Sequence, residues 1–364
     1  MRVLIAPDSF KGSASAAAVA TALAAGWLAV RPGDQVTRLP LADGGEGTLD
    51  VLAATVPGAR WRRTRVTGPG GGPVHCRWLQ LPGQVAVVEL ARASGLPLLA
   101  HPDPMGAHTI GLGEVLGRAL DAGATRILVG LGGSASTDGG TGALTALGAR
   151  FLDASGQPLP PGGGALATLA GADLRRLRPP PPDGVTCLAD VTAPLLGPRG
   201  AAAVYGPQKG ANAAQIARLE AGLAQLAEVL GGDPGAPGAG AAGGTGYGLS
   251  AAWGAGFAPG AVELSRLAGL DRALAGADLV ITGEGRFDPT SLTGKTTGTV
   301  LAAAAAAGIP AALVAGQVSG PVPDGIEAVT LAALAGGAVP AQASPARWLR
   351  EAGRRLAGAA SATS

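Results

Sequence analysis

Short apolar runs alternate with alanine-rich segments along the chain, and this pattern predicts alternating strands and helices. Arg2–Ala6 predicts a strand, and the alanine-rich segment that ends at Val30 predicts a helix with Ser13 as its N-cap. The same pattern predicts strands at Val36–Leu41, Arg126–Gly130, Asp278–Thr282 and Ala311–Ala315, and helices at Gly45–Val56, Asp138–Gly148 and Thr297–Gly308. This alternation indicates a parallel sheet with helices on its faces.

Two stretches depart from the pattern. Between Trp61 and Glu89 the residues alternate without a helical period, which predicts a strand meander and the edge of a domain. Gly231–Gly248 has the composition of a flexible linker, although composition alone does not separate a linker from a loop that faces a ligand.

Composition narrows the class of protein. The 364 residues allow two or three domains. Glycine supplies 62 residues and aromatics only 3%, so the core has to be built from alanine, leucine and valine. The glycines lie between apolar runs and have no collagen period, which favours glycine-turned α/β structure over fibrous or disordered classes.

Charge and cysteine content limit the partners and the location. A net charge of +2 is too small for a nucleic-acid surface but leaves small anionic ligands open. Cys76 and Cys187 match neither a metal spacing nor a disulfide framework, so a reducing compartment is expected. Because Val300–Gly316, the longest apolar stretch, is interrupted by Gly308 and Pro310, we expect a cytoplasmic protein without a membrane span.

Lysine is rare in this chain and occurs beside glycine. Of 27 cationic residues only Lys11, Lys209 and Lys295 are lysines. A lysine next to a loop glycine, where backbone N–H groups can point at an anion, is a phosphate-binding arrangement. The alternative is that all three are surface lysines at turns.

The turn Gly130–Ala135 supports a rival hypothesis. It reads as G-x-G-x-x-A between an expected strand and helix, and Asp153 lies at a suitable spacing, as in a dinucleotide-binding fingerprint of a nicotinamide-dependent oxidoreductase. However, Asp138 would repel a pyrophosphate at the helix start unless Mg²⁺ lay between them. Pro289 stands where a P-loop needs glycine, which argues against a P-loop NTPase.

Carboxylates recur in the loops that follow the expected strands. Because ligands of parallel sheets bind beyond the carboxyl ends of strands, several of these groups could converge on one cleft. Together with the lysines they favour a site that handles phosphate and a divalent metal. The residues are Asp8, Asp43, Glu46, Asp138, Asp190, Glu284 and Asp288.

Seven motifs occur in order along the chain: Ala6–Gly12, Leu41–Thr48, Leu131–Ala135, Asp190–Thr192, Tyr205–Gly210, Pro237–Gly244 and Ile281–Arg286. Together they closely resemble the type I glycerate kinase family. The resemblance runs from residue 1 to about residue 320. Some positions depart from the family pattern: Thr137, Ala193 and Thr290 replace common Asn, Asn and Gln residues, and the segment at His108 also differs.

The resemblance implies ATP-dependent phosphorylation of D-glycerate, typically to 2-phosphoglycerate, with Mg²⁺. It implies two α/β domains around a cleft. One would be Rossmann-like with a parallel sheet, from residues 1–68 and 278–364. The other, residues 69–277, would have a mixed sheet and a glycine-rich phosphate-binding loop, so the stretch ending at Gly248 becomes an expected site loop. The partner would be glycerate, without nucleic acid or membrane, and a monomer and a homo-oligomer both stay open.

Site roles follow as expectations from the motifs and the resemblance. Asp190 would accept the glycerate hydroxyl proton, while Lys11 and Lys295 would neutralise the transferring phosphoryl group or the substrate carboxylate. The expected cofactor-binding residues are Gly132, Gly133, Ser134, Asp138 and Lys209. The expected substrate-binding residues are Asp8, Ser9, Glu284 and Arg286, and the expected metal ligands are Asp43, Glu46 and Asp288.

Overall fold

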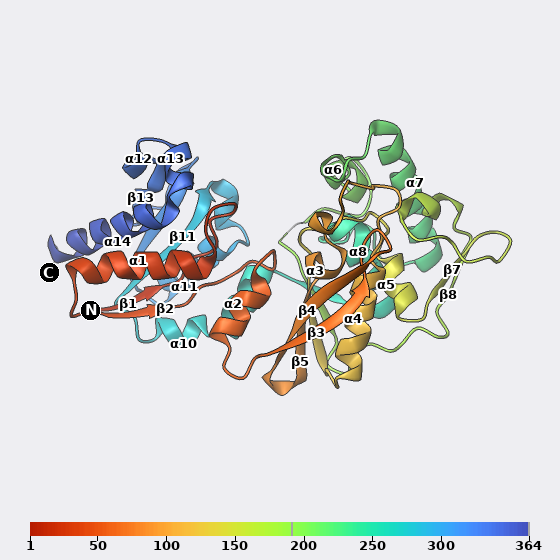
Figure 1. The fold of residues 1–364 in the computed structure, drawn as a ribbon, viewed down its shortest axis with the longest axis horizontal. Helices are drawn as coiled ribbons and strands as arrows, with labels where there is room; N and C mark the ends of the chain where they lie inside the picture. The colour runs from red at the N-terminus through yellow and green to blue at the C-terminus, as the bar shows by residue number, and fades with distance from the viewer. Residues whose placement is uncertain (191, 363–364) are drawn as a thin grey trace. The chain divides into compact units, whose positions relative to one another are not determined.

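The computed structural model describes residues 1–190 and 192–362, which form an α/β fold in two compact units (Figure 1). Unit 1 comprises Met1–Asp43, Asp50–Pro57 and Pro259–Ser364, and unit 2 comprises Gly44–Leu49 and Gly58–Ala258. The predicted α/β class is confirmed. The two units are defined by contacts within the chain and do not test which segments fold as domains. The predicted domain boundaries at residues 68 and 277 therefore stay a prediction.

Unit 1 is built on a five-stranded sheet in which every neighbouring pair of strands is parallel. Taken in chain order, the strands are arranged 5-4-3-1-2, which is the flavodoxin-like form of the doubly wound sheet and not the strand order of the Rossmann fold. Across the sheet the strands are β13 (Glu327–Thr330), β12 (Ala311–Val318), β11 (Leu279–Phe287), β1 (Arg2–Ile5) and β2 (Gln35–Arg38).

Alternating side chains of β1 bury both faces of this sheet. Val3 and Ile5 pack into one apolar cluster with α1 (Ala16–Val30) and α14 (Pro345–Ala362). Leu4 packs into a second cluster on the opposite face. The helices of that second face are α9 (Gly260–Ala268), α10 (Leu270–Leu274) and α11 (Thr296–Ala306). Shorter helices of unit 1 are α2 (Thr48–Thr55), whose first turn belongs to unit 2, α12 (Leu331–Ala335) and α13 (Ala338–Ala343).

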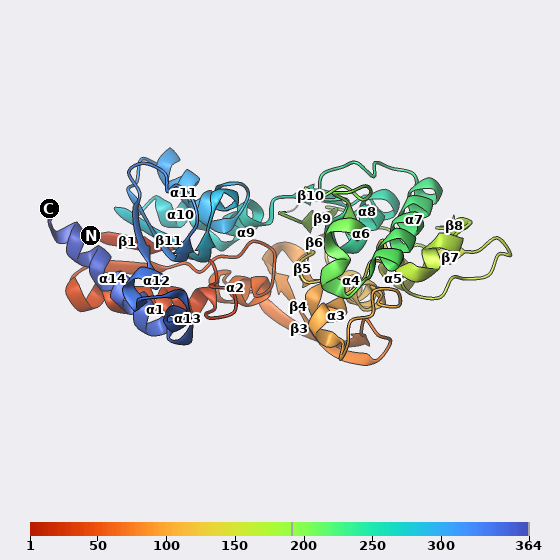
Figure 2. The same ribbon diagram turned by 90° about the horizontal axis from the view of Figure 1, so that it is seen from above.

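Helices α1 and α14 lie side by side in both views (Figures 1 and 2). They can approach closely because glycines occupy positions at their contact. A Cβ atom on Gly26 would lie 2.8 Å from the carbonyl carbon of Arg350, and one on Gly353 would lie 3.0 Å from the nitrogen of Trp27. The two ends of the chain are therefore fastened together within unit 1.

Unit 2 contains a mixed sheet, as the resemblance implied. Its strands β3, β4 and β5 form the predicted antiparallel meander, and the remaining strands are parallel. The sheet order is β10 (Gly256–Ala258), β9 (Val185–Leu188), β6 (Arg126–Gly130), β5 (Val85–Glu89), β4 (Pro73–Leu81) and β3 (Arg60–Thr67). The other elements are β7 (Arg150–Leu152), β8 (Gly171–Asp173), α3 (Ala91–Ser94), α4 (Ile110–Asp121), α5 (Thr141–Ala146), α6 (Ala201–Tyr205), α7 (Ala213–Leu230) and α8 (Ala241–Trp253).

Several local predictions need correction. The N-cap of α1 is Ser15, whose hydroxyl accepts the N–H of Ala18, and not Ser13. Helix α5 begins at Thr141 rather than Asp138, because the Asp138 carboxylate accepts backbone N–H groups of the turn before the helix. Glu284 lies inside β11 and not in a loop, because β11 stays paired with β12 as far as Phe287.

The linker interpretation of Gly231–Gly248 is wrong, because this stretch enters the core of unit 2. Gly243 is buried with φ +66°, in the left-handed region that favours glycine. A Cβ atom there would overlap the carbonyl of Ser136 and would lie 2.7 Å from the Cα of Thr137. The glycines thus allow two backbone segments to touch. Among residues 1–190 and 192–362, no helix combines the length and the hydropathy needed to span a membrane.

Candidate active site

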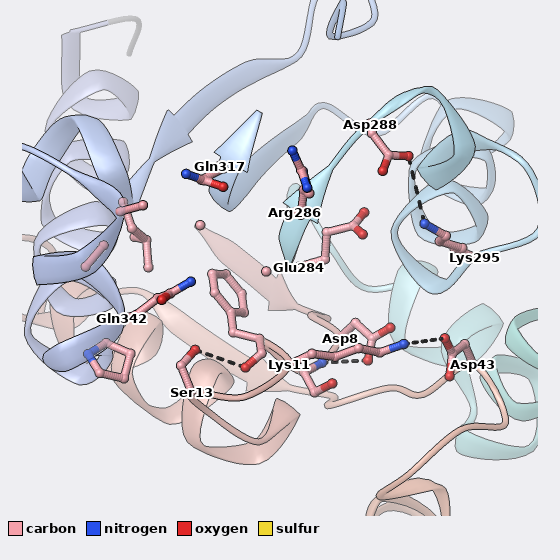
Figure 3. Close-up of a pocket in the computed structure, with 18 residues that line it drawn as sticks. Asp8, Lys11, Ser13, Asp43, Glu284, Arg286, Asp288, Lys295, Gln317 and Gln342 are labelled. Carbon is pink, nitrogen blue, oxygen red and sulfur yellow. Dashed lines mark hydrogen bonds and ion pairs between the residues drawn. The ribbon is translucent and has the colours of Figure 1, made fainter. Parts of the chain in front are cut away.

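A cavity of about 390 Å³ opens in unit 1 at the carboxyl ends of β1, β11 and β12 (Figure 3). The chain leaves β1 for α1 on one face of the sheet and leaves β11 for α11 on the other. Because the loops after two neighbouring strands diverge, a crevice forms between them. The fold therefore provides a ligand site without any special sequence motif.

The loop after β1 supplies one wall of this pocket. It is fixed to the neighbouring strand by the N–H of Asp8, which donates to the carbonyl of Gly283 at 2.8 Å. Burial and the adjacent charge of Asp43 raise the pKa of Asp8 to about 6, although the N–H of Ser9 donates to its carboxylate at 2.5 Å. Lys11 Nζ lies 3.8 Å from Asp43 Oδ2.

The opposite wall is the end of β11, where alternate residues Glu284 and Arg286 both line the pocket. Glu284 is 9% exposed, and its Oε1 has no hydrogen-bond partner among the described residues. Burial raises the pKa of this carboxyl. Arg286 Nε donates to Ser319 Oγ at 3.3 Å, which leaves the rest of the guanidinium beside the cavity.

Asp288 and Lys295, which follow β11 in the chain, also line the pocket. Asp288 caps the short 3-10 turn η5 (Pro289–Leu292) by accepting the N–H of Thr290 at 2.8 Å and the hydroxyl of Thr290 at 2.5 Å. That hydroxyl holds the pKa of Asp288 below its ordinary value, with a smaller contribution from the charge of Lys295. Lys295 Nζ lies 3.9 Å from the same carboxylate. Thr290, a departure from the family pattern, therefore orients this acid.

The structure brings more than half of the predicted site residues into this one pocket. They include residues predicted to bind the substrate, residues predicted to bind the metal, and the two lysines predicted to neutralise the phosphoryl group. The residues are Asp8, Ser9, Lys11, Asp43, Glu284, Arg286, Asp288 and Lys295.

Sequence reasoning missed three polar side chains that line the pocket, Ser13, Gln317 and Gln342. Gln317 is at the carboxyl end of β12, so its position after a predicted strand was a usable signal that a search for charged residues overlooks. Gln342 lies in α13 and reaches the pocket only through the tertiary fold.

The remaining predicted residues belong to unit 2. Glu46 lies in the segment 44–49, which packs on the glycine turn after β6: a Cβ atom on Gly132 would lie 3.1 Å from the Cα of Gly45. Asp190 follows β9, and Val191, the middle residue of its motif, is outside the described residues. The others are Gly132, Gly133, Ser134, Asp138 and Lys209.

Lys209 and Asp138 are both deeply buried in unit 2. Lys209 is 2% exposed and donates from Nζ to Ser134 Oγ at 2.8 Å and to the carbonyl of Ser136. Burial lowers the pKa of Lys209 to about 7, opposed by the charge of Asp138. Asp138 accepts the N–H and the hydroxyl of Thr109, each at 2.8 Å. Both side chains therefore stabilise the loop between β6 and α5 through buried hydrogen bonds.

The structure does not place Asp153 where the dinucleotide-binding hypothesis needs an acidic residue. Asp153 Oδ1 accepts the N–H of Ser155 at 2.9 Å and the N–H of Gln157 at 2.9 Å, so this carboxylate organises a tight turn. That turn follows β7, which belongs to the separate two-stranded sheet, whereas the fingerprint needs the acid after a strand of the parallel sheet.

No set of three or more His, Cys, Asp or Glu residues within 1–190 and 192–362 is arranged to hold a metal ion. Of the predicted metal ligands, Asp43 and Asp288 line the pocket of unit 1, and Glu46 belongs to unit 2.

Comparisons with known proteins agree with the motifs. The model of the glycerate kinase family matches residues 3–362. The chain is 41% identical over 307 residues to a glycerate 2-kinase of Escherichia coli (strain K12), covering 81% of this chain and 80% of the relative. It is 42% identical over 338 residues to a glycerate kinase of Bacillus subtilis (strain 168), covering 88% and 86%.

A solved crystal structure is also similar over its full length. It is that of a protein from Salmonella typhimurium LT2 provisionally named glycerate kinase 2, with a TM-score of 0.84, 37% identity and coverage of 100% of this chain and 99% of that one. A family match that spans almost the whole chain, with relatives above 40% identity, makes this protein a member of the glycerate kinase family and therefore a kinase.

Proposed function

We propose that this kinase transfers the γ-phosphoryl group of ATP to the 2-hydroxyl of D-glycerate, giving 2-phospho-D-glycerate and ADP. The observation that carries the proposal is the pocket of unit 1, where three cations and four carboxylates surround one cavity at the carboxyl ends of parallel strands. The name of the Escherichia coli relative, glycerate 2-kinase, supports the regiochemistry. Use of ATP places the enzyme in the cytoplasm under this proposal.

Two carboxylates of the pocket would contribute ligands to a magnesium ion, which supplies charge neutralisation for the phosphates when bound. Two pocket carboxylates, Asp8 and Asp43, are close enough for the charge of one to raise the pKa of the other, and this repulsion would be relieved by a cation between them. Their oxygen atoms are the hard ligands that Mg²⁺ takes. Asp8 and Asp43 would hold the ion, with Asp288 as a further ligand directly or through water.

The reaction needs positioning and charge neutralisation more than covalent help. The glycerate oxygen forms a bond to the γ-phosphorus, the bond to the bridging oxygen of ADP breaks, and the hydroxyl proton is released. Lys11 and Lys295 would neutralise the transferring group. Arg286 presents a planar fork that suits the substrate carboxylate.

Unit 2 carries the rest of the proposed machinery. Asp190 would accept the hydroxyl proton, and the turn Gly132–Ser134 would offer backbone N–H groups to phosphate. Lys209 and Asp138, which hydrogen-bond within the loop, would keep that turn in shape. Glu46, whose segment packs on the turn Gly132–Ser134, would serve there as a metal ligand.

The test is to incubate the purified chain with ATP, Mg²⁺ and D-glycerate and to identify the product by phosphorus NMR. We expect the doublet of a phosphate on a secondary carbon, and L-glycerate serves as the control for stereochemistry. A 3-phosphate product would refute the regiochemistry. Thermal stabilisation by NAD⁺ without stabilisation by ATP and Mg²⁺ would refute the kinase assignment of this site.

A further inference from the structure

The pocket of unit 1 is larger than the proposed acceptor substrate requires. D-glycerate has seven non-hydrogen atoms, whereas the cavity measures about 390 Å³. Cavities of about 300 to 1,000 Å³ hold ligands of drug or cofactor size. A second, larger ligand moiety therefore has room beside the charged groups.

The chemistry of the pocket is divided between two ends. In Figure 3 the charged residues Asp43, Asp288 and Lys295 lie at one end, and Gln317 and Gln342 lie at the other. Arg286 and Glu284 lie between them. A ligand that spans the cavity would therefore have a polyanionic part and an uncharged polar part.

The uncharged end combines amides with apolar side chains. Phe10, Leu331 and Ala341 line the pocket and are 2%, 1% and 4% exposed. Ala341 and Gln342 are neighbours in α13, and α13 packs on β12, which carries Gln317. Neither glutamine amide hydrogen-bonds to another residue of the pocket in Figure 3. An apolar lining with a few polar groups that fix orientation is typical of a pocket that binds an organic ligand.

Resting on the proposed function, we infer that the Gln317–Gln342 end of this pocket binds the adenine base of ATP, with the triphosphate directed toward Lys11 and Lys295. A glutamine amide offers one donor and one acceptor, which match the amino group and a ring nitrogen of adenine. Guanine presents two acceptors on the corresponding edge and makes no such bidentate pair. The pocket lies where the strand order of unit 1 reverses, the place at which doubly wound sheets bind nucleotides.

The experiment separates the base from the phosphates. Gln317→Ala, Gln342→Ala and the double variant are compared with Gln35→Ala, an exposed glutamine of β2 outside the pocket. Binding of ATP, adenosine and inorganic tripolyphosphate is measured by calorimetry with Mg²⁺ present. Steady-state kinetics give KM for ATP, KM for GTP and KM for D-glycerate.

We expect the double variant to bind ATP and adenosine at least about fivefold more weakly, and to bind tripolyphosphate as the unaltered protein does. KM for ATP should rise, KM for glycerate should stay within about twofold, and the preference for ATP over GTP should fall. Equal losses for ATP and tripolyphosphate, or no loss for either, would overturn the inference.

A second variant guards against a weak effect of the glutamines. Ala338→Trp, in α13, would fill the uncharged end and should abolish adenosine binding while tripolyphosphate still binds. Undiminished adenosine binding would again refute the inference. If the unaltered protein binds ATP through the glutamines but does not phosphorylate glycerate, the proposed function fails and the adenine site stands.

Discussion

The Nζ atom of Lys209 donates a hydrogen bond to Oγ of Ser134 at a distance of 2.8 Å inside unit 2. The same ammonium group donates to the carbonyl of Ser136, so one cation holds two points of the turn after β6. Lys209 is contributed by the 3-10 turn η4 (Pro207–Lys209), far away in the sequence. The lysine therefore joins the turn after β6 to a loop that is distant in the sequence.

The burial of Lys209 predicts an unusual dependence of stability on pH. Burial lowers its pKa from 10.5 to about 7 in the folded protein, so folding disfavours the charged form. The destabilisation is complete below pH 7, and stability rises between pH 7 and 10.5, where the unfolded chain binds more protons. The whole effect is on the order of a few kcal/mol. Urea unfolding at pH 7 and pH 9 measures it.

Substitution separates this effect from other titrations. Lys209→Met should remove the rise in stability between pH 7 and pH 9. Lys11→Met, which removes an exposed lysine, should preserve it. An identical rise in both variants would mean that Lys209 does not titrate as its burial requires.

Lysine-to-arginine substitutions test the point charges of the pocket. Lys11→Arg and Lys295→Arg keep the charge but replace a compact ammonium with a larger planar fork. We expect each to fold normally and to lose about tenfold to a thousandfold in kcat/KM, or about 1.4 to 4 kcal/mol of transition-state stabilisation. Arg63→Lys, at an exposed position of β3 in unit 2, is the control. Near-normal rates in both pocket variants would show that any cation suffices there.

Glu284→Gln should separate stability from activity. The carboxylate is buried with one oxygen lacking a partner among the described residues, which costs folding free energy when the group is ionised. The neutral amide of similar size should therefore raise the melting temperature at pH 7. Because the proposed role is to bind the substrate, kcat/KM for glycerate should fall by about a hundredfold. A variant that is both less stable and fully active would contradict this assignment.

Gly243→Ala should unfold unit 2 or severely destabilise it. The added Cβ atom would lie 2.7 Å from the Cα of Thr137 and 2.9 Å from Nζ of Lys209, and the backbone has φ +66°. Gly123→Ala is the matched control, because Gly123 has φ +79° with open space around its Cβ position. The control should lose only about 1 kcal/mol from its conformation. Equal losses in denaturant unfolding would show that the close approach costs nothing.

The sequence predicted the order of elements better than their ends. Strand Arg126–Gly130 has its predicted bounds, because its apolar run stops where the strand stops. β11 was predicted too short, because Gly283, Glu284 and Gly285 interrupt its apolar pattern while pairing with β12 continues. Pairing between strands decides where this strand ends, and a single segment does not contain that information.

The pocket was predictable in part for a general reason. Asp8, Glu284 and Asp288 follow or end parallel strands, and the carboxyl ends of such strands share one edge of a sheet. Asp43 lies in unit 1 and Glu46, three residues later, lies in unit 2. No pattern in the sequence indicates that the boundary falls between them. Gln342 carries no local signal at all, because it reaches the pocket through the packing of α13.

The composition of unit 1 from both ends of the chain has a consequence for biosynthesis. Val3 pairs with Leu279, so β1 cannot gain its central neighbour until about 276 further residues have been made. At about 5 to 20 residues per second this interval lasts roughly 14 to 55 s. Throughout it, the apolar side chains of β1 have only β2 and α1 to pack against, and one edge of the strand is unpaired. Nascent chains stalled within unit 2 should therefore depend on chaperones, and a circular permutant that makes β1 and β11 contiguous should not.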